Sequence, residues 1–160
     1  MSPRTGVAQS APSLAVAAPA VATPIREDGA KLPVTGEIVK VLIHRRDDRG
    51  MCLEPFASRC VQQGEVHELV TTDQRETEPG ARIDRVGFLG FARIGPAGVL
   101  DRGDELWIEE RRIGVILGFD GCHLPNHYNI LVATETTLTG PDVSLVPGAR
   151  ILFRQVLPDA

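Results

Sequence analysis

The chain consists of short apolar runs separated by glycine and proline turns, and this pattern limits the fold more than any other feature. The runs span residues 36–44, 65–71, 82–94, 99–108, 112–119 and 145–154. Several of them alternate apolar and polar residues, as half-buried strands do, and none has the pattern of an amphipathic helix of three turns. The 160 residues suit one domain. We therefore predict a mainly β protein, a small closed or nearly closed β-barrel of about six to eight strands.

The faces of two predicted strands bear on the rest of the argument. In the run 36–44, alternation predicts one buried face made of Val39, Val41 and Ile43. In the run 65–71, the same rule places His67 on the opposite face from Glu68. We expect His67 to point into the barrel, where a buried imidazole needs a hydrogen-bond partner.

The first 34 residues differ from the rest because they are rich in alanine and proline. Such a segment cannot bury enough surface to offset its ordering entropy. We therefore predict a flexible, disordered N-terminal tail over residues 1–34 and one β-barrel domain over residues 35–160. Ala20-Val21-Ala22 resembles a signal-peptide cleavage site, which leaves secretion as an alternative. The apolar run before it is broken by Pro19 and is too short to span a bilayer.

Charge and cysteine usage exclude several classes of partner. The net charge is −4 and the charges are interspersed, which argues against a nucleic-acid surface. No run is long enough to predict a membrane span. Cys52, Cys60 and Cys122 form an odd set without a CxxC pair, so we expect reduced thiols, a cytoplasmic protein and small buried cysteine side chains. Arginine far outnumbers lysine, which is common in GC-rich bacterial genomes.

The stretch 118–129 between two predicted strands has the highest density of reactive side chains. Its two histidines, His123 and His127, have the i, i+4 spacing of helical zinc sites. Pro125 and a nearby glycine disfavour a helix there. We interpret residues 124–127 instead as a β-turn with the proline at its second position. Such a turn is able to bring the two imidazoles together.

Three interpretations of this stretch remain open. A zinc ion needs three or four ligands, and the candidates are His123, His127, Cys122, His67 and Asp120. A metal-free site would use histidine as acid or base, with Asp120 orienting it and Tyr128 donating a hydrogen bond to developing charge. In the third interpretation the histidines only cap strand ends and the asparagines satisfy the loop backbone.

A resemblance to a known family covers about 50 residues. The run 100–108, followed by Ile113-Gly114-Val115, Phe119-Asp120-Gly121 and Pro125, resembles the C-terminal half of the glucitol/sorbitol-specific IIA component of the bacterial phosphotransferase system. The resemblance implies a β-barrel that carries a phosphohistidine, and His67 is the nearest histidine ahead of this region. The family's phosphorylation motif is not recognisable here. More broadly, the chain resembles small uncharacterised bacterial families of unknown function.

Our leading hypothesis is a barrel that binds a small molecule and catalyses non-redox acid–base chemistry, such as isomerisation, cyclisation or hydrolysis. The predicted site residues are His123, His127, Asp120, Tyr128 and His67, with no cofactor required and a divalent metal such as zinc as the alternative. A non-catalytic ligand sensor or protein-interaction module is the second hypothesis, and a phosphohistidine carrier is the third. Exposed barrel edges are compatible with a homodimer.

Overall fold

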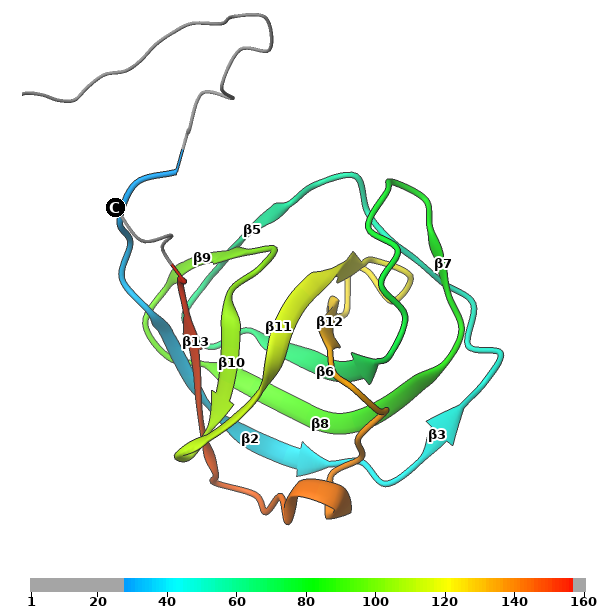
Figure 1. Cartoon of the computed structure of the whole chain (residues 1–160). Helices are drawn as coiled ribbons and strands as arrows, with labels where there is room; N and C mark the ends of the chain where they lie inside the picture. Colours follow the sequence, from blue (N-terminus) through cyan, green and yellow to red (C-terminus); the bar gives the residue numbers. More distant parts are fainter. Residues whose placement is uncertain (1–27, 157–160) are drawn as a thin grey trace, which may run out of the picture.

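The computed structural model describes residues 28–156 and forms one closed ring of seven strands (Figure 1). The ring strands are β2 (Val34–Val41), β6 (Val66–Thr72), β8 (Val86–Ile94), β10 (Glu105–Ile108), β11 (Arg111–Asp120), β12 (Asn129–Ala133) and β13 (Arg150–Arg154). Their order is β2-β13-β10-β11-β12-β6-β8, and β8 pairs back with β2. This ring confirms the predicted mainly β fold with a closed barrel.

Neighbouring ring strands are antiparallel except β6 and β12, which are parallel. Because the ring closes, it has no free sheet edge, and the predicted homodimer stays a prediction without that support. Among residues 28–156, the one helical element is the short 3-10 turn η2 (Pro141–Val143). None of the described helices is long and apolar enough to span a membrane.

Three short strand pairings lie outside the seven-stranded ring. Strand β3 (Arg45–Arg46) extends β8, β4 (Met51–Cys52) pairs with β7 (Arg82–Ile83), and β5 (Ser58–Val61) pairs with β9 (Gly98–Asp101). In Figure 1, β3 and β7 lie on the side of the ring away from β13. The segments that carry them cover part of the outer face of the ring.

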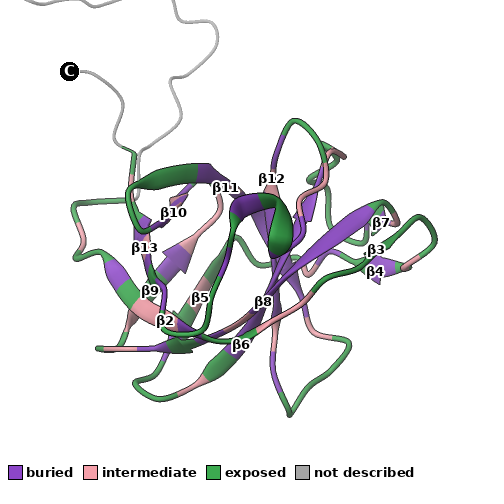
Figure 2. Cartoon of the chain, turned by 90° about the horizontal axis from the view of Figure 1, so that it is seen from below, coloured by how far each residue is buried: buried purple, intermediate pink, exposed green. Residues whose placement is uncertain are grey.

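The side chains of β6 and β12 divide between two hydrophobic clusters. Leu69 and Ile130 point into the barrel interior, where the larger cluster lies. Val70 and Leu131 point outward and pack with Met51 and the other residues of a second, smaller cluster. Strand β8 contributes to both clusters and is buried over most of its length (Figure 2). The outer face of these strands is therefore also covered, which permits a buried site outside the barrel.

Strand β2 does not bury the face that alternation predicted. Val34 and Ile38 are the residues that enter the core. Val39 is 37% exposed and Ile43 is 72% exposed, so the prediction that both are buried was wrong. Val39 is the extra residue at the register shift between Ile38 and Lys40 in the pairing with β8, and Ile43 lies beyond the end of β2. Of the predicted face, Val41 alone packs, partly buried, against the core.

Two glycines in β8 mark close crossings of the backbone. A Cβ atom at Gly87 would lie 2.5 Å from the carbonyl oxygen of Leu138, and one at Gly90 would lie 2.3 Å from that of Lys40. Glycine inside a strand indicates such an approach, as the sequence suggested for this run. Neither position can accept a side chain without moving backbone.

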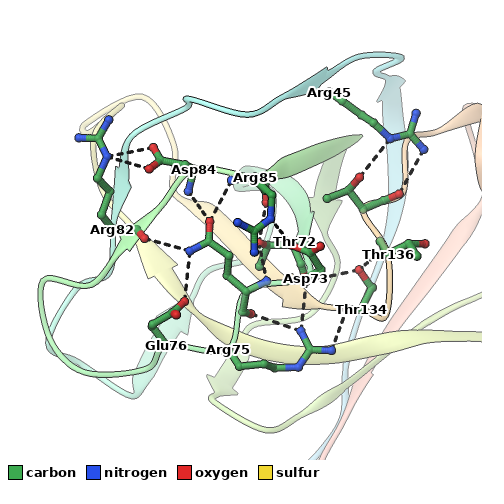
Figure 3. Close-up of polar contacts among 12 residues, drawn as sticks. Arg45, Thr72, Asp73, Arg75, Glu76, Arg82, Asp84, Arg85, Thr134 and Thr136 are labelled. Atoms are coloured by element: carbon green, nitrogen blue, oxygen red, sulfur yellow. Dashed lines mark hydrogen bonds and ion pairs between the residues drawn. The ribbon is translucent and has the colours of Figure 1, made fainter.

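Polar contacts fasten the segment between β6 and β8 over the second cluster (Figure 3). Arg75 donates from Nη2 to the carbonyl oxygen of Thr134 at 2.8 Å. The Arg82 guanidinium pairs with Asp84, and Arg85 pairs with Asp73 at 2.9 Å (Figure 3). This segment is therefore held to the end of β12, next to the strands that build the site.

The predicted tail of residues 1–34 lies mostly outside the described residues. Within the described part, Lys31 lies 2.6 Å from Asp101 and 2.5 Å from Asp104. Strand β2 itself begins at Val34. Contacts with the barrel therefore begin a few residues before the predicted domain boundary.

Candidate metal centre

Four residues from four adjacent strands form a row across the outer face of the ring. Asp120 of β11 is opposite Asn129 of β12, Asn129 is opposite Glu68 of β6, and Glu68 is opposite Phe91 of β8. Residues directly opposite each other project on the same side of a sheet. Asp120, Asn129 and Glu68 are each at most 6% exposed. The sheet therefore presents a buried carboxylate, an amide and a second carboxylate side by side.

The β11–β12 loop folds so that its two histidines meet. The backbone N–H of Asn126 donates to the carbonyl oxygen of His123 at 2.8 Å, and that of His127 donates to the same oxygen at 3.3 Å. The turn therefore runs from His123 to Asn126, and Pro125 is its third residue, not its second as predicted. The Leu124–Pro125 bond is cis. The two imidazole rings stack with centroids 4.9 Å apart, so they converge without a helix.

Glu68 completes a group of three metal-binding side chains with the two histidines. Each of Glu68, His123 and His127 offers one ligand atom, and these atoms lie within 4.8 Å of one another. Oε1 of Glu68 is 3.2 Å from Nε2 of His127. Ligands at zinc bond lengths are about 3.3 Å apart in a tetrahedral site. Glu68 and His127 are buried, while His123 is exposed and forms the solvent side of the group.

The imidazole of His127 is oriented by two further side chains. Its ring meets the Phe91 ring edge-on at 5.1 Å between centroids. The side-chain amide of Asn126 lies 3.0 Å from Nδ1 of His127. If the amide presents its oxygen, it accepts from Nδ1–H and leaves Nε2 as the ligand atom. Such outer partners orient metal-bound histidines in known sites.

Asp120 holds the loop and not a histidine. Its Oδ1 accepts from the backbone N–H of Cys122 at 2.9 Å and from Asn129 Nδ2 at 3.0 Å. Its Oδ2 accepts from the backbone N–H of Cys52 at 2.7 Å. Burial by itself raises the pKa of Asp120, but hydrogen bonds from Cys122, Cys52 and Asn129 outweigh it and keep the pKa below its usual value. Asp120 is therefore an ionised anchor, and neither oxygen contacts His123 or His127.

Cys122 lies beside the group as a thiol. Its Sγ is 3.5 Å from Asn129 Nδ2 and 3.7 Å from Arg49 Nη2. Partial burial and the negative charge of Asp120 raise the pKa of the Cys122 thiol, against the opposing effect of Arg49. A metal ligand is the thiolate, so Cys122 is the weaker candidate. All three cysteines are exposed, so the expectation that they are small buried residues was wrong.

His67 and Tyr128 lie on the other side of the sheet. His67 is 5% exposed, and its Nδ1 accepts from the backbone N–H of Tyr128 at 3.0 Å. Its Nε2 lies 3.1 Å from Oε1 of Glu65. The Tyr128 ring stacks under the Arg59 guanidinium at 4.0 Å. The structure therefore does not bring His67 and Tyr128 to His123 and His127, and it gives the phosphohistidine hypothesis no accessible nitrogen on His67.

Two members of the cluster were not among the residues that the sequence suggested. Glu68 is the one acidic residue of β6 and lies on the same face as Val66 and Val70, and a buried carboxylate must have a partner. That signal was present in the sequence. Arg49, whose Nη2 is 2.7 Å from Nε2 of His123, lies 74 residues away along the chain, and no local pattern indicates the contact.

Two surface grooves lie away from Glu68, His123 and His127. A groove of about 620 Å³ lies along β2, β8 and β13, and another of about 460 Å³ lies beside Arg111 and Arg112. Neither is lined by any of the three metal-binding side chains. Buried titratable groups with specific partners are the better indicator of a site than the size of an open groove.

Comparison with known proteins identifies the family but no function. Neither the curated proteins nor the solved structures contain a match. The resemblance to the glucitol/sorbitol IIA component therefore stays a prediction from the sequence. A family model matches residues 28–154, which is almost the whole described part of the chain. The chain belongs to this family, DUF6917, a family of unknown function, as the sequence suggested.

Proposed function

We propose that this protein binds a divalent metal ion such as zinc through Glu68, His123 and His127, and uses it in non-redox chemistry on a small molecule. One observation carries the proposal: three ligand atoms from β6 and the β11–β12 loop lie within 4.8 Å of one another. Two histidines and a carboxylate are a common ligand set of catalytic zinc, which keeps a fourth position for water or substrate.

The alternative structural explanation accounts for only part of the arrangement. A buried Glu68 needs a partner, and His127 alone satisfies this need. The side chain of His123 stacks on His127 and contributes no hydrogen bond to that pair. Its convergence on the same point is what a metal site requires and what a buried ion pair does not.

The chemical role of each side chain follows from its exposure. Glu68 and His127 would hold the ion from the buried side, and the exposed His123 would close the site at the solvent boundary. A metal in such a site supplies Lewis acidity and a water of lowered pKa. The protein would therefore act on a small-molecule substrate by hydrolysis or a related isomerisation or cyclisation, in the cytoplasm that its unpaired thiols favour.

A second candidate function needs no metal and rests on the contact between Glu68 and His127. A carboxylate 3.2 Å from Nε2 can orient an imidazole as an acid or base. In this form Glu68 takes the role that the sequence suggested for Asp120. The loss of metal binding on substitution separates the two candidates.

The test is zinc binding by calorimetry and cobalt(II) binding by absorption spectroscopy on the purified protein. We expect one ion per chain, and we expect Glu68→Gln and His127→Ala each to weaken binding by more than about 100-fold, because each removes a ligand. His44→Ala is the matched control, since His44 stacks on Phe88 at 4.1 Å and is not part of the group. Unchanged binding in Glu68→Gln would refute the proposal.

A further inference from the structure

We infer that the ligand of this site is an oxyanion, either a carboxylate or a phosphate, and that Arg49 binds it beside the metal. This inference rests on the proposed metal site and names the class of molecule that the site accepts. It is carried by the position of Arg49, by its choice of partners and by the charge of the cluster.

Arg49 is anchored through its backbone and contacts the site through the tip of its side chain. Its backbone N–H donates to the carbonyl oxygen of Asp84 at 3.1 Å, and the next N–H, of Gly50, donates to Oδ1 of Asp84 at 2.9 Å. Nη2 lies 2.7 Å from Nε2 of His123. The base of the side chain is therefore fixed while the guanidinium lies against the imidazole of a proposed metal ligand.

Arg49 differs from most of the arginines around it in its partners; Arg75, which donates to backbone carbonyl oxygens, is the other one in the described part of the chain without a carboxylate. Four neighbours in the same covering segments each pair with a carboxylate: Arg45 with Asp142, Arg46 with Asp48, Arg82 with Asp84, and Arg85 with Asp73. Among the described residues, Arg49 pairs with no carboxylate and contacts a ring nitrogen and a thiol instead. A guanidinium is built to bind a planar or tetrahedral oxyanion through two parallel hydrogen bonds. This capacity of Arg49 is not used by the protein.

The charge of the cluster favours an anion once a metal is bound. Glu68 and the ionised Asp120 contribute two negative charges, and Arg49 contributes one positive charge. Adding a divalent ion changes the local sum from −1 to +1. An ion bound through the His123 imidazole would lie close to the Arg49 guanidinium, which contacts the same ring. An oxyanion bound between the ion and Arg49 would satisfy both cations.

The experiment uses the cobalt(II)-loaded full chain and two probes, inorganic phosphate and acetate, titrated separately while the absorption spectrum is followed. We expect at least one probe to change the spectrum saturably, and the stronger one identifies the anion class. The affinity of the cobalt-loaded protein for the stronger probe should fall by at least ten-fold in Arg49→Met. The affinity of Arg49→Lys should lie between those of Arg49→Met and the wild type. Arg46→Met is the matched control from the adjoining strand β3 and should behave as the wild type.

The same variants separate the failure of this inference from the failure of the metal site. Arg49→Met should keep cobalt binding or tighten it, because a competing cation has been removed. If cobalt binds but neither anion changes the spectrum, or if Arg49→Met binds the anion as well as the wild type, the inference is wrong and the metal site stands. If the wild type binds no metal, the proposed function is wrong and the inference fails with it.

Discussion

Each face of β6 presents one residue of a histidine–glutamate pair, and the two pairs have different surroundings. On the barrel side, His67 pairs with Glu65, and on the outer side, Glu68 pairs with His127. The distances of the two pairs are almost equal, 3.1 and 3.2 Å. The pairing itself therefore does not distinguish a structural histidine from a site histidine.

The neighbours of each pair make the distinction. Both ring nitrogens of His67 have fixed partners, and the small hollow that it lines has no room for a water molecule. His127 has a second imidazole stacked on it, and Arg49 lies at the solvent side of that imidazole. What indicates a functional site on the outer face is therefore less the burial of the pair than its neighbours: a second imidazole, and a guanidinium without a carboxylate partner among the described residues.

The largest expected effect on stability comes from the inner pair. His67→Ala should lower the free energy of unfolding by about 2–4 kcal/mol, because it leaves a cavity and a buried N–H of Tyr128 without an acceptor. His123→Ala should change it by less than about 0.5 kcal/mol, because the side chain is exposed. Urea unfolding of the metal-free proteins measures both.

Zinc binding should show the opposite order, with the larger loss in His123→Ala and not in His67→Ala. His123→Ala removes a ligand, whereas His67→Ala does not, so only the former should lose affinity. Equal zinc affinities in the two folded variants would remove the distinction between the faces.

Substitution of Asp120, which anchors the loop on the outer face, should have an intermediate effect on the free energy of unfolding. Asp120→Asn should cost about 2 kcal/mol at neutral pH, because an amide presents N–H groups where the carboxylate accepted buried donors. The pKa of Asp120 is lowered from 3.8 in the folded protein, so its contribution is present above about pH 4 and is lost as the pH falls through the lower value.

The difference in stability between wild type and Asp120→Asn should therefore shrink on acidification below pH 4. Chemical denaturation at pH 7 and at pH 3 measures it. A difference that grows towards pH 3 would contradict the role of Asp120 as an ionised anchor.

Among the carboxylates, the smallest effect on stability is expected from Glu65, the inner one. A backbone hydrogen bond from Gln62 and the contact with His67 lower the pKa of Glu65, against partial burial. Its side chain is 40% exposed, so solvent screens the interaction. Glu65→Gln should cost less than about 1 kcal/mol, with the same direction of pH dependence as Asp120. A thermal-unfolding series of Glu65→Gln beside Glu68→Gln compares the two carboxylates directly, and a larger loss in Glu65→Gln would contradict the comparison.

The sequence predicted the class of fold and the region of the site from local properties. Strand periods and turn residues indicated a closed barrel. The closeness of His123 and His127 within one short loop predicted a site in the β11–β12 connection. Alternation also placed His67 and Glu68 on opposite faces correctly, because it depends only on the backbone of one strand. It failed around β2, where Val39 is the extra residue at a register shift and Ile43 lies beyond the end of the strand.

The amino-acid sequence by itself determined that two histidines lie in a turn between barrel strands and that Glu68 shares a strand face with Val66 and Val70. Only the tertiary structure decided which face of β6 meets that turn. The parallel register of β6 with β12 brings Glu68 beside Asn129 and under the loop, and the covering segment delivers Arg49 from 74 residues away. These contacts depend on pairings between distant segments, and no local period in the chain encodes a distance between strands.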